Sequence, residues 1–263
     1  MKRSVLGVLV DVTSYHHATG AVLAAARERR PFAVTALAVH GVMTGVLDRE
    51  HGARLNSFDL VTPDGQPVRW ALNTLHRAAL RDRVYGPDLT IEVLRAAMRE
   101  ELPVYLYGST TDTLNLLQSR LRTALPSLKI AGAEPSKFRS NNAGEAMDIA
   151  ARIRDSGARI VLVGLGCPRQ EAFAHAMRPL LPMPLLAVGA AFDYHSGRLR
   201  PPPEWMQQHG LEWLWRLALE PRRLWRRNLL NPCYLVLFAA QRSGLWRASP
   251  PPAASTCSSR FPV

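Results

Sequence analysis

The stretch Ile160-Val-Leu-Val-Gly-Leu-Gly-Cys-Pro-Arg-Gln-Glu171 decides the fold class. Its first four residues are apolar and predict a buried strand, which the following glycines end. Helical spacing of apolar residues then resumes over residues 170–180. A buried strand that passes through a short glycine loop into a helix is the repeating unit of an α/β sheet.

The same alternation runs through the first 200 residues of the chain. Further short apolar runs predict strands at Val5–Val10, Phe32–Val39, Val104–Tyr107 and Leu185–Val188. Helical spacing occupies Ala18–Arg30, Leu89–Glu101, Thr111–Leu125 and Asn142–Ser156. We therefore expect an α/β fold with a largely parallel sheet flanked by helices, which binds ligands at the carboxyl ends of its strands.

The pattern changes after Pro201-Pro-Pro203, where only helical segments follow. We predict a core over residues 1–200, a helical C-terminal appendage over 201–247 and a disordered Pro/Ser/Ala-rich tail over 248–263. No apolar run is long enough for a spanning helix or a signal segment. The three cysteines form no C-x-x-C pair, so we expect a reducing compartment and no structural zinc.

Positive charge is concentrated in the predicted appendage. The chain of 263 residues has a formal net charge of +12, and residues 198–247 contain nine arginines against three glutamates, together with five of the six tryptophans. Arginine beside tryptophan favours phosphate at an apolar boundary, as in lipid headgroups, lipid diphosphates or nucleic acid. Arg222, Arg223, Arg226 and Arg227 fall within an arc of about 140° on a helix, which suits either a membrane interface or a solvated face.

Several polar motifs follow predicted strands or loops. Tyr107-Gly108-Ser-Thr110, Gly164 to Glu171 and Val188 to Asp193 each end a strand, while Pro63-Asp64-Gly65 and Arg83-Val-Tyr-Gly-Pro-Asp88 lie in turns. Free N–H groups at the start of a helix bind phosphate, although turn formation and helix capping also explain several of these motifs. The chain lacks a P-loop, a third dinucleotide-binding glycine, H-E-x-x-H and D-x-D, so no familiar metal-dependent site is expected.

Taken in order, these motifs resemble those of the WecG/TagA/CpsF glycosyltransferase family. The match rests on Leu165 to Glu171, Gly189-Ala-Ala-Phe-Asp193, Gly197, Arg200, Pro202, Gly210-Leu-Glu-Trp-Leu-Trp-Arg-Leu217 and Glu220-Pro-Arg222, with the two upstream motifs at Asp64 and Arg83. The resemblance covers approximately residues 5–230.

The resemblance implies a Rossmann-like core and an inverting glycosyltransferase that needs neither a metal nor a cofactor. Its expected partners are a UDP-sugar donor, a polyprenyl-diphosphate-linked acceptor and an anionic membrane surface, on the cytoplasmic face of the membrane. The products of the family feed exopolysaccharide, teichoic acid or common antigen synthesis. The resemblance also implies that the appendage targets the membrane and completes the active site. The oligomeric state is left open, and a homo-oligomer is one possibility.

The family motifs also suggest roles for individual residues. Asp64 matches the base that takes the acceptor proton, and Arg83 and Gln170 match positions near the diphosphate and the sugar. The remaining expected substrate contacts are Gly108, Gly166, Arg169, Glu171, Asp193, which contacts the nucleoside, and Arg216, Arg222 and Arg223, which contact the lipid diphosphate. Members often carry Thr-x-Asn after the second strand. This chain has alanines at those polar positions, so either Thr35 or His40 is the expected substitute.

Two other functions compete with this interpretation. A nucleic-acid-binding α/β protein would account for the basic segment but not for the polar strand ends. A nicotinamide-dependent enzyme would suit the fold but lacks the third glycine of its fingerprint. The motifs therefore favour a glycosyltransferase, and we expect no nucleic acid partner.

Overall fold

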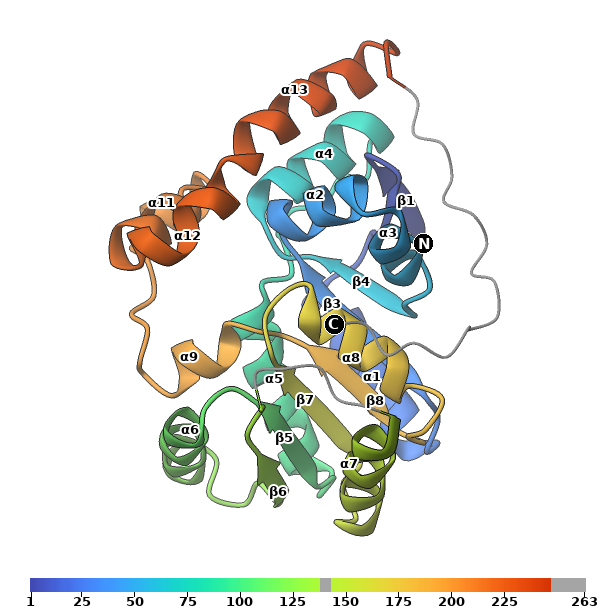
Figure 1. Cartoon of the computed structure of the whole chain (residues 1–263), viewed down its shortest axis with the longest axis vertical. Coiled ribbons are helices and arrows are strands. Elements are labelled where there is room, and N and C mark those ends of the chain that lie inside the picture. The colour runs from blue at the N-terminus through green and yellow to red at the C-terminus, as the bar shows by residue number, and fades with distance from the viewer. Residues whose placement is uncertain (138–142, 247–263) are drawn as a thin grey trace.

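The computed structural model describes residues 1–137 and 143–246, and within them a six-stranded parallel sheet forms the centre of the molecule (Figure 1). The strands lie in the order β4-β3-β8-β7-β5-β6, and every neighbouring pair is parallel. Their bounds are β3 (Phe32–Leu37), β4 (Leu60–Pro63), β5 (Val104–Gly108), β6 (Ile130–Glu134), β7 (Ile160–Gly164) and β8 (Pro184–Ala187). The predicted α/β fold with a parallel sheet is confirmed.

Helices cover both faces of the sheet because each strand points alternate side chains to opposite sides. Val161 and Val163 of β7 join one hydrophobic cluster, and Ile160 and Leu162 join the other. The first cluster includes residues from α2 (Val39–Leu47), α3 (Arg49–Asn56), α4 (Gln66–His76), α7 (Ala143–Asp155) and α8 (Arg169–Met177). The second includes residues from α1 (Tyr15–Arg27), α5 (Gly86–Arg99), α6 (Thr111–Ala124) and α9 (Ala191–His195).

The N-terminal prediction of one strand over Val5–Val10 is wrong. The chain instead forms an antiparallel hairpin of β1 (Lys2–Val5) and β2 (Val8–Asp11), separate from the main sheet. Leu6 and Gly7 form the turn with φ angles of 52° and 90°, so both central residues have the left-handed backbone of a tight hairpin. The turn was not predicted because its residue Leu6 is apolar and buried in the core, so the apolar run continues through the turn.

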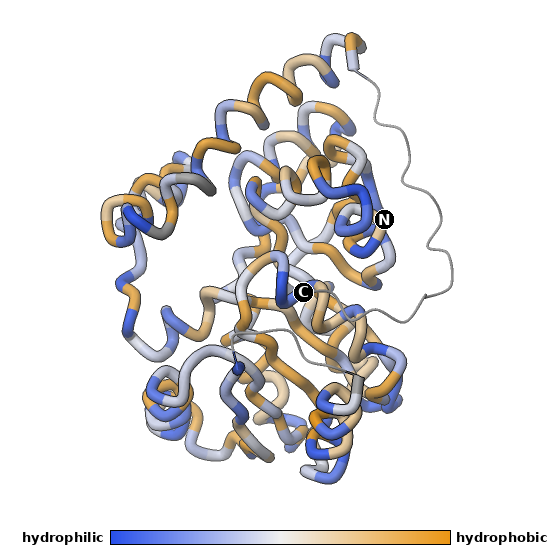
Figure 2. The backbone as a smooth tube through the Cα atoms, viewed as in Figure 1, coloured by the Kyte–Doolittle hydropathy of each residue, from blue (hydrophilic) through white to orange (hydrophobic). Residues whose placement is uncertain are grey.

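The segment after residue 200 is helical, as expected, with α10 (Glu204–Gln208), α11 (Glu212–Leu219), α12 (Pro221–Asn228) and α13 (Leu230–Arg242). Helix α13 packs on α2 and α4, and the buried Tyr234 donates its hydroxyl to the Pro67 carbonyl at 3.0 Å. Figure 2 shows hydrophobic residues along the sheet strands and mixed hydropathy along α11 to α13. The division into two domains stays a prediction, and the tail over 248–263 lies outside the described residues.

Across the described residues, no helix combines the length and the apolar character that crossing a membrane requires.

Candidate active site

The loops that follow the carboxyl ends of the strands line one wall of a cleft of about 1470 Å³, and helices α11 to α13 line another. In Figure 1, α11 and α12 lie to the side of the sheet and α13 runs across α4. The cleft brings together eight residues that the sequence predicts for the site, namely His40, Asp64, Gly166, Arg169, Gln170, Glu171, Asp193 and Arg216. Four others do not line it: Thr35, Arg83, Gly108 and Arg222. The side chain of Arg223 lies outside the described part of the structure.

Asp64 lies directly after β4 and is fixed by contacts from two neighbouring elements. Its N–H donates to the Leu37 carbonyl at 3.2 Å, and its Oδ1 accepts from the Gly86 N–H at 2.5 Å. Gly86 opens α5, and a helix N-terminus favours negative charge. A Cβ on Gly86 would meet Ala36 Cβ at 3.1 Å and Asp64 Oδ1 at 3.3 Å, so the absence of a side chain allows this approach. The structure therefore holds a carboxylate at the cleft wall.

Arg83 is buried behind the cleft and is bound by the appendage. Its guanidinium makes a two-pronged salt bridge with Glu212, the first residue of α11, with Nη2 donating to Oε1 at 2.6 Å. The same group lies 4.3 Å from the centre of the Tyr85 ring, a cation–π contact. Burial lowers the pKa of Arg83, but the hydrogen bonds and charge of Glu212 outweigh it, so the pKa rises overall. The predicted contact of Arg83 with the diphosphate stays a prediction.

A buried network shapes the loop between β7 and α8. Gln170 accepts from the Gly166 N–H through Oε1 at 3.1 Å and donates through Nε2 to Glu171 Oε1 at 2.9 Å. The Thr35 hydroxyl donates to the same Glu171 oxygen at 3.0 Å. Burial is the main cause of the raised pKa of Glu171. Thr35 therefore contacts Glu171 and does not line the cleft itself. Gln170 holds the loop that faces the cleft through its hydrogen bond with the Gly166 N–H.

Gly166 and Gly108, both at the carboxyl edge of the sheet, differ in what surrounds them. Gly166 has a φ of 77°, and a Cβ there would meet no atom within 4 Å, so its backbone faces open space in the cleft. Gly108 has a φ of 114°, and a Cβ there would lie 2.7 Å from the Gly164 carbonyl oxygen. Gly108 therefore allows β5 and β7 to approach each other, while Ser109 and Thr110 after it line the cleft.

Four arginines line the cleft, namely Arg169, Arg198, Arg200 and Arg216, and two of them were predicted for the site. Arg169 is exposed in the first turn of α8. Arg216 of α11 lies 3.7 Å from Glu220, and its buried Nε has no hydrogen-bond partner among residues 1–137 and 143–246. A buried donor without an acceptor is costly, so this nitrogen suits an anionic ligand. Arg222 of α12 is exposed outside the cleft.

The aromatic lining of the cleft was not predicted from the sequence. Tyr85 and Tyr194 contact each other edge to face, with ring centres 6.2 Å apart. Trp70 of α4, Trp213 of α11 and Trp225 of α12 complete this lining. The concentration of tryptophan in the appendage could have indicated Trp213 and Trp225. No sequence pattern places α4, which carries Trp70, opposite them. The cleft therefore combines a carboxylate, cationic groups and an amphipathic wall, which suits a substrate with sugar, phosphate and apolar parts.

Comparisons with known proteins agree with this chemistry. The sequence model of the glycosyl transferase WecG/TagA/CpsF family matches residues 3–248. An N-acetylglucosaminyldiphosphoundecaprenol N-acetyl-beta-D-mannosaminyltransferase of Bacillus subtilis (strain 168) is 32% identical over 192 residues, which cover 73% of this chain and 72% of that protein. A protein of the same name from Bacillus spizizenii is 31% identical over 185 residues, 70% of this chain and 69% of that protein.

Proposed function

The chain belongs to the WecG/TagA/CpsF family of glycosyltransferases, and on that premise we propose that it transfers an N-acetylmannosaminyl unit from a UDP-sugar to a lipid-linked N-acetylglucosaminyl diphosphate. The donor sugar and the acceptor are taken from the names of the two relatives. The observation that carries the proposal is the position of Asp64, Arg169 and Arg216 around one cleft between the sheet edge and the appendage.

The proposed transfer is a single displacement at the anomeric carbon of the donor sugar. The acceptor hydroxyl oxygen forms the new bond to that carbon while the bond to the UDP oxygen breaks, so the configuration inverts. Asp64 takes the hydroxyl proton, and the departing UDP carries away the electron pair as negative charge. A general base of this kind contributes about 10²–10⁴-fold to the rate.

Positive groups in the cleft stabilise the charge that develops on UDP. Arg169 is the first residue of α8, where the N–H groups of a helix start favour phosphate. Arg216 offers its Nε from the appendage side, where this nitrogen has no hydrogen-bond partner among the described residues. We assign Arg169 to the donor diphosphate and Arg216 to the lipid-linked diphosphate, because the appendage carries the apolar surface that an undecaprenyl chain requires.

Apolar side chains on the appendage support a peripheral association with a lipid surface. Exposed residues of this kind are Trp213, Leu214, Leu219, Trp225, Leu229, Leu235 and Val236. Several of them also line the cleft, so its mouth continues into an apolar surface. An amphipathic surface with arginines and tryptophans suits the boundary between headgroups and acyl chains.

A donor and acceptor screen tests the proposal. The full chain is incubated with UDP-N-acetylmannosamine or UDP-N-acetylglucosamine and a short-chain lipid-linked N-acetylglucosaminyl diphosphate, and both UDP release and product mass are measured. We expect UDP release with the first donor only when the acceptor is present, and a product heavier by one N-acetylhexosamine residue. Turnover with neither donor would contradict the proposal. Tight binding of DNA at physiological salt, without binding to anionic vesicles, would favour the nucleic-acid hypothesis instead.

A further inference from the structure

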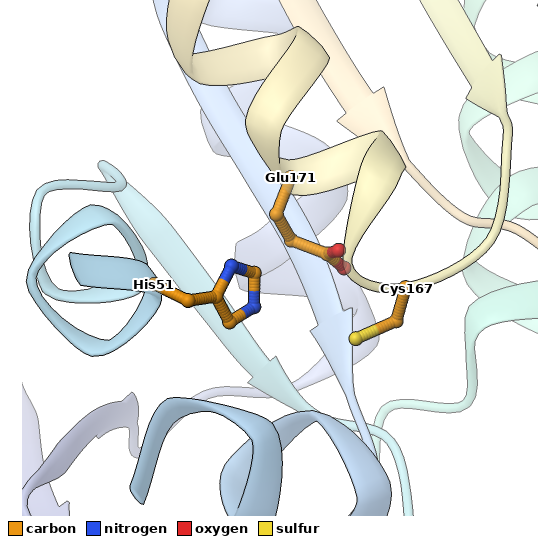
Figure 3. A group of neighbouring side chains, drawn as sticks. All are labelled: His51, Cys167 and Glu171. Carbon is orange, nitrogen blue, oxygen red and sulfur yellow. The ribbon is translucent and has the colours of Figure 1, made fainter. Parts of the chain in front are cut away.

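A group of reactive side chains lies against the loop that joins β7 to α8 (Figure 3). His51 comes from α3, Cys167 from the loop and Glu171 from the first turn of α8. Their ligand-capable nitrogen, sulfur and oxygen atoms all lie within 4.8 Å of one another. Figure 3 shows the three side chains directed toward a common centre.

Two members of this group are fully buried and carry an atom that lacks a partner. His51 and Glu171 are both 0% exposed. His51 Nε2 and Glu171 Oε2 have no hydrogen-bond partner of good geometry within the described parts of the chain. The Cys167 side chain already hydrogen-bonds to Glu171. A buried polar atom left without a partner costs about 1–3 kcal/mol, so His51 Nε2 and Glu171 Oε2 on either side of this thiol offer a place for a shared ligand.

We propose that His51, Cys167 and Glu171 bind one divalent transition-metal ion of the zinc class through Nε2, Sγ and Oε2. Imidazole nitrogen, thiolate sulfur and carboxylate oxygen are the donors that Zn²⁺ takes in proteins. Around a tetrahedral zinc, bonds of 2.0–2.3 Å place ligand atoms about 3.5 Å apart. The atoms here need to approach one another by about 1.3 Å at most, which side-chain rotation provides.

Metal binding requires a neutral imidazole, a thiolate and a carboxylate, and the ion must outweigh the burial that raises the pKa of Glu171. Burial and the nearby Arg54 lower the pKa of His51 to about 4, so its ring is neutral at pH 7 and requires no proton loss. Cys167 binds as a thiolate and releases its proton to solvent, and Glu171 binds as a carboxylate. The two negative ligands balance the charge of a divalent ion, which lowers the cost of burying it.

Metal binding fixes which nitrogen of His51 carries the proton. With Nε2 on the ion, the proton must lie on Nδ1, which now faces Arg54 Nη1 at 3.2 Å. Two donors cannot share that contact, so Arg54 must turn toward Glu50, with which it already pairs at 2.8 Å. The ion can enter from the cleft, because Cys167 and Glu171 line it.

The proposed ion acts apart from the transfer chemistry, which Asp64 carries. Its expected effect is to join α3 to the loop of Gly166 and Gln170, because Glu171 Oε1 keeps its bonds to Thr35 and Gln170. The sequence predicts no zinc site because its ligands lie far apart in the chain. The inference stands whether or not the proposed donor and acceptor are correct.

Cobalt titration tests this site directly. The full chain is treated with a chelator, buffer-exchanged and titrated with Co²⁺ alone, and absorption is followed in the near-ultraviolet and visible ranges. We expect a saturable thiolate-to-cobalt charge-transfer band and tetrahedral visible bands at one ion per chain, both removed by added Zn²⁺. Cys167→Ser should abolish the charge-transfer band, and His51→Gln should weaken binding at least tenfold. Cys233→Ser, which removes an exposed thiol on α13, should change neither.

A second measurement needs no variant and therefore does not depend on their folding. The wild-type chain is treated with iodoacetamide with and without Zn²⁺, and the modified peptides are identified by mass spectrometry. We expect Zn²⁺ to slow the alkylation of Cys167 at least tenfold while Cys233 reacts at the same rate. A cobalt spectrum without a charge-transfer band, a band that persists in Cys167→Ser, or equal alkylation of Cys167 with and without Zn²⁺ would overturn the proposal.

Discussion

Replacing Glu212 by glutamine should loosen the attachment of α11 to the core. Glu212 and Arg83 are largely buried, with side chains 16% and 8% exposed, and they form a two-pronged salt bridge. Removal of one partner from a buried pair costs about 3–5 kcal/mol, because the other charge is left without compensation. Glutamine keeps one acceptor oxygen, and Tyr85 still stacks on the guanidinium. We therefore expect a loss of about 2 kcal/mol, or about 30-fold in the docking equilibrium.

Native-state hydrogen exchange of the full chain measures this loss where it occurs. Amides within α11 should exchange about 30-fold faster in Glu212→Gln, while amides of β7 in the central sheet should be unchanged. Glu204→Gln is the matched control, because Glu204 is exposed on neighbouring α10 and its replacement should leave α11 unaffected.

A double-variant cycle identifies the pair as the cause. Arg83→Gln alone should speed exchange in α11 by a similar factor, and adding Glu212→Gln should cause little further loss, because both changes remove the same interaction. Unchanged α11 exchange in Glu212→Gln would refute the view that this salt bridge attaches the appendage. An equal increase in β7 would show general destabilisation instead.

Further predictions concern backbone geometry, the membrane and pH. Gly108→Ala should lower the free energy of unfolding in urea by about 2–4 kcal/mol, because its methyl group would meet the Gly164 carbonyl. Gly166→Ala should cost only about 1–2 kcal/mol in stability but raise the KM for the UDP-sugar several-fold, because its methyl group projects into the cleft. Trp213→Ser should reduce cosedimentation with vesicles containing anionic lipid, while the melting temperature stays near that of the wild type because this indole is 40% exposed. Burial lowers the pKa of His195 below its usual 6.5, so the unfolded chain binds the proton more readily; stability should fall as pH drops below 6.5, and His195→Gln should reduce that slope.

The parallel sheet was predictable because its central strands are continuous apolar runs followed by glycine and a helix. Residues 160–180 contain the whole strand–loop–helix unit, and the structure forms β7 and α8 there. Strand β6 was not predicted because Ile130-Ala-Gly-Ala-Glu134 is a half-buried edge strand with few large apolar residues. Helices α2 to α4 were not predicted because these segments are too short to show a clear helical repeat of apolar residues.

The site was predictable where a residue directly follows a strand and not where it depends on distant packing. Gln170 belongs to a motif that ends a predicted strand, Asp64 was predicted from the family motif in a turn, and both line the cleft. The pairing of Arg83 with Glu212 joins residues 129 positions apart, and no local pattern in either segment indicates the other. His51 was not predicted for the same reason, because only folding places α3 beside the loop that carries Cys167.

The most direct test of Asp64 as the base compares transfer and donor binding in Asp64→Asn. Single-turnover transfer from UDP-N-acetylmannosamine to the lipid-linked acceptor is measured beside calorimetric binding of the donor, with Asp148→Asn, an exposed carboxylate of α7, as control. We predict that Asp64→Asn slows transfer by about 10²–10⁴-fold while donor affinity changes less than threefold, and that Asp148→Asn behaves as the wild type. Transfer at the wild-type rate in Asp64→Asn would contradict the assignment of this carboxylate as the base.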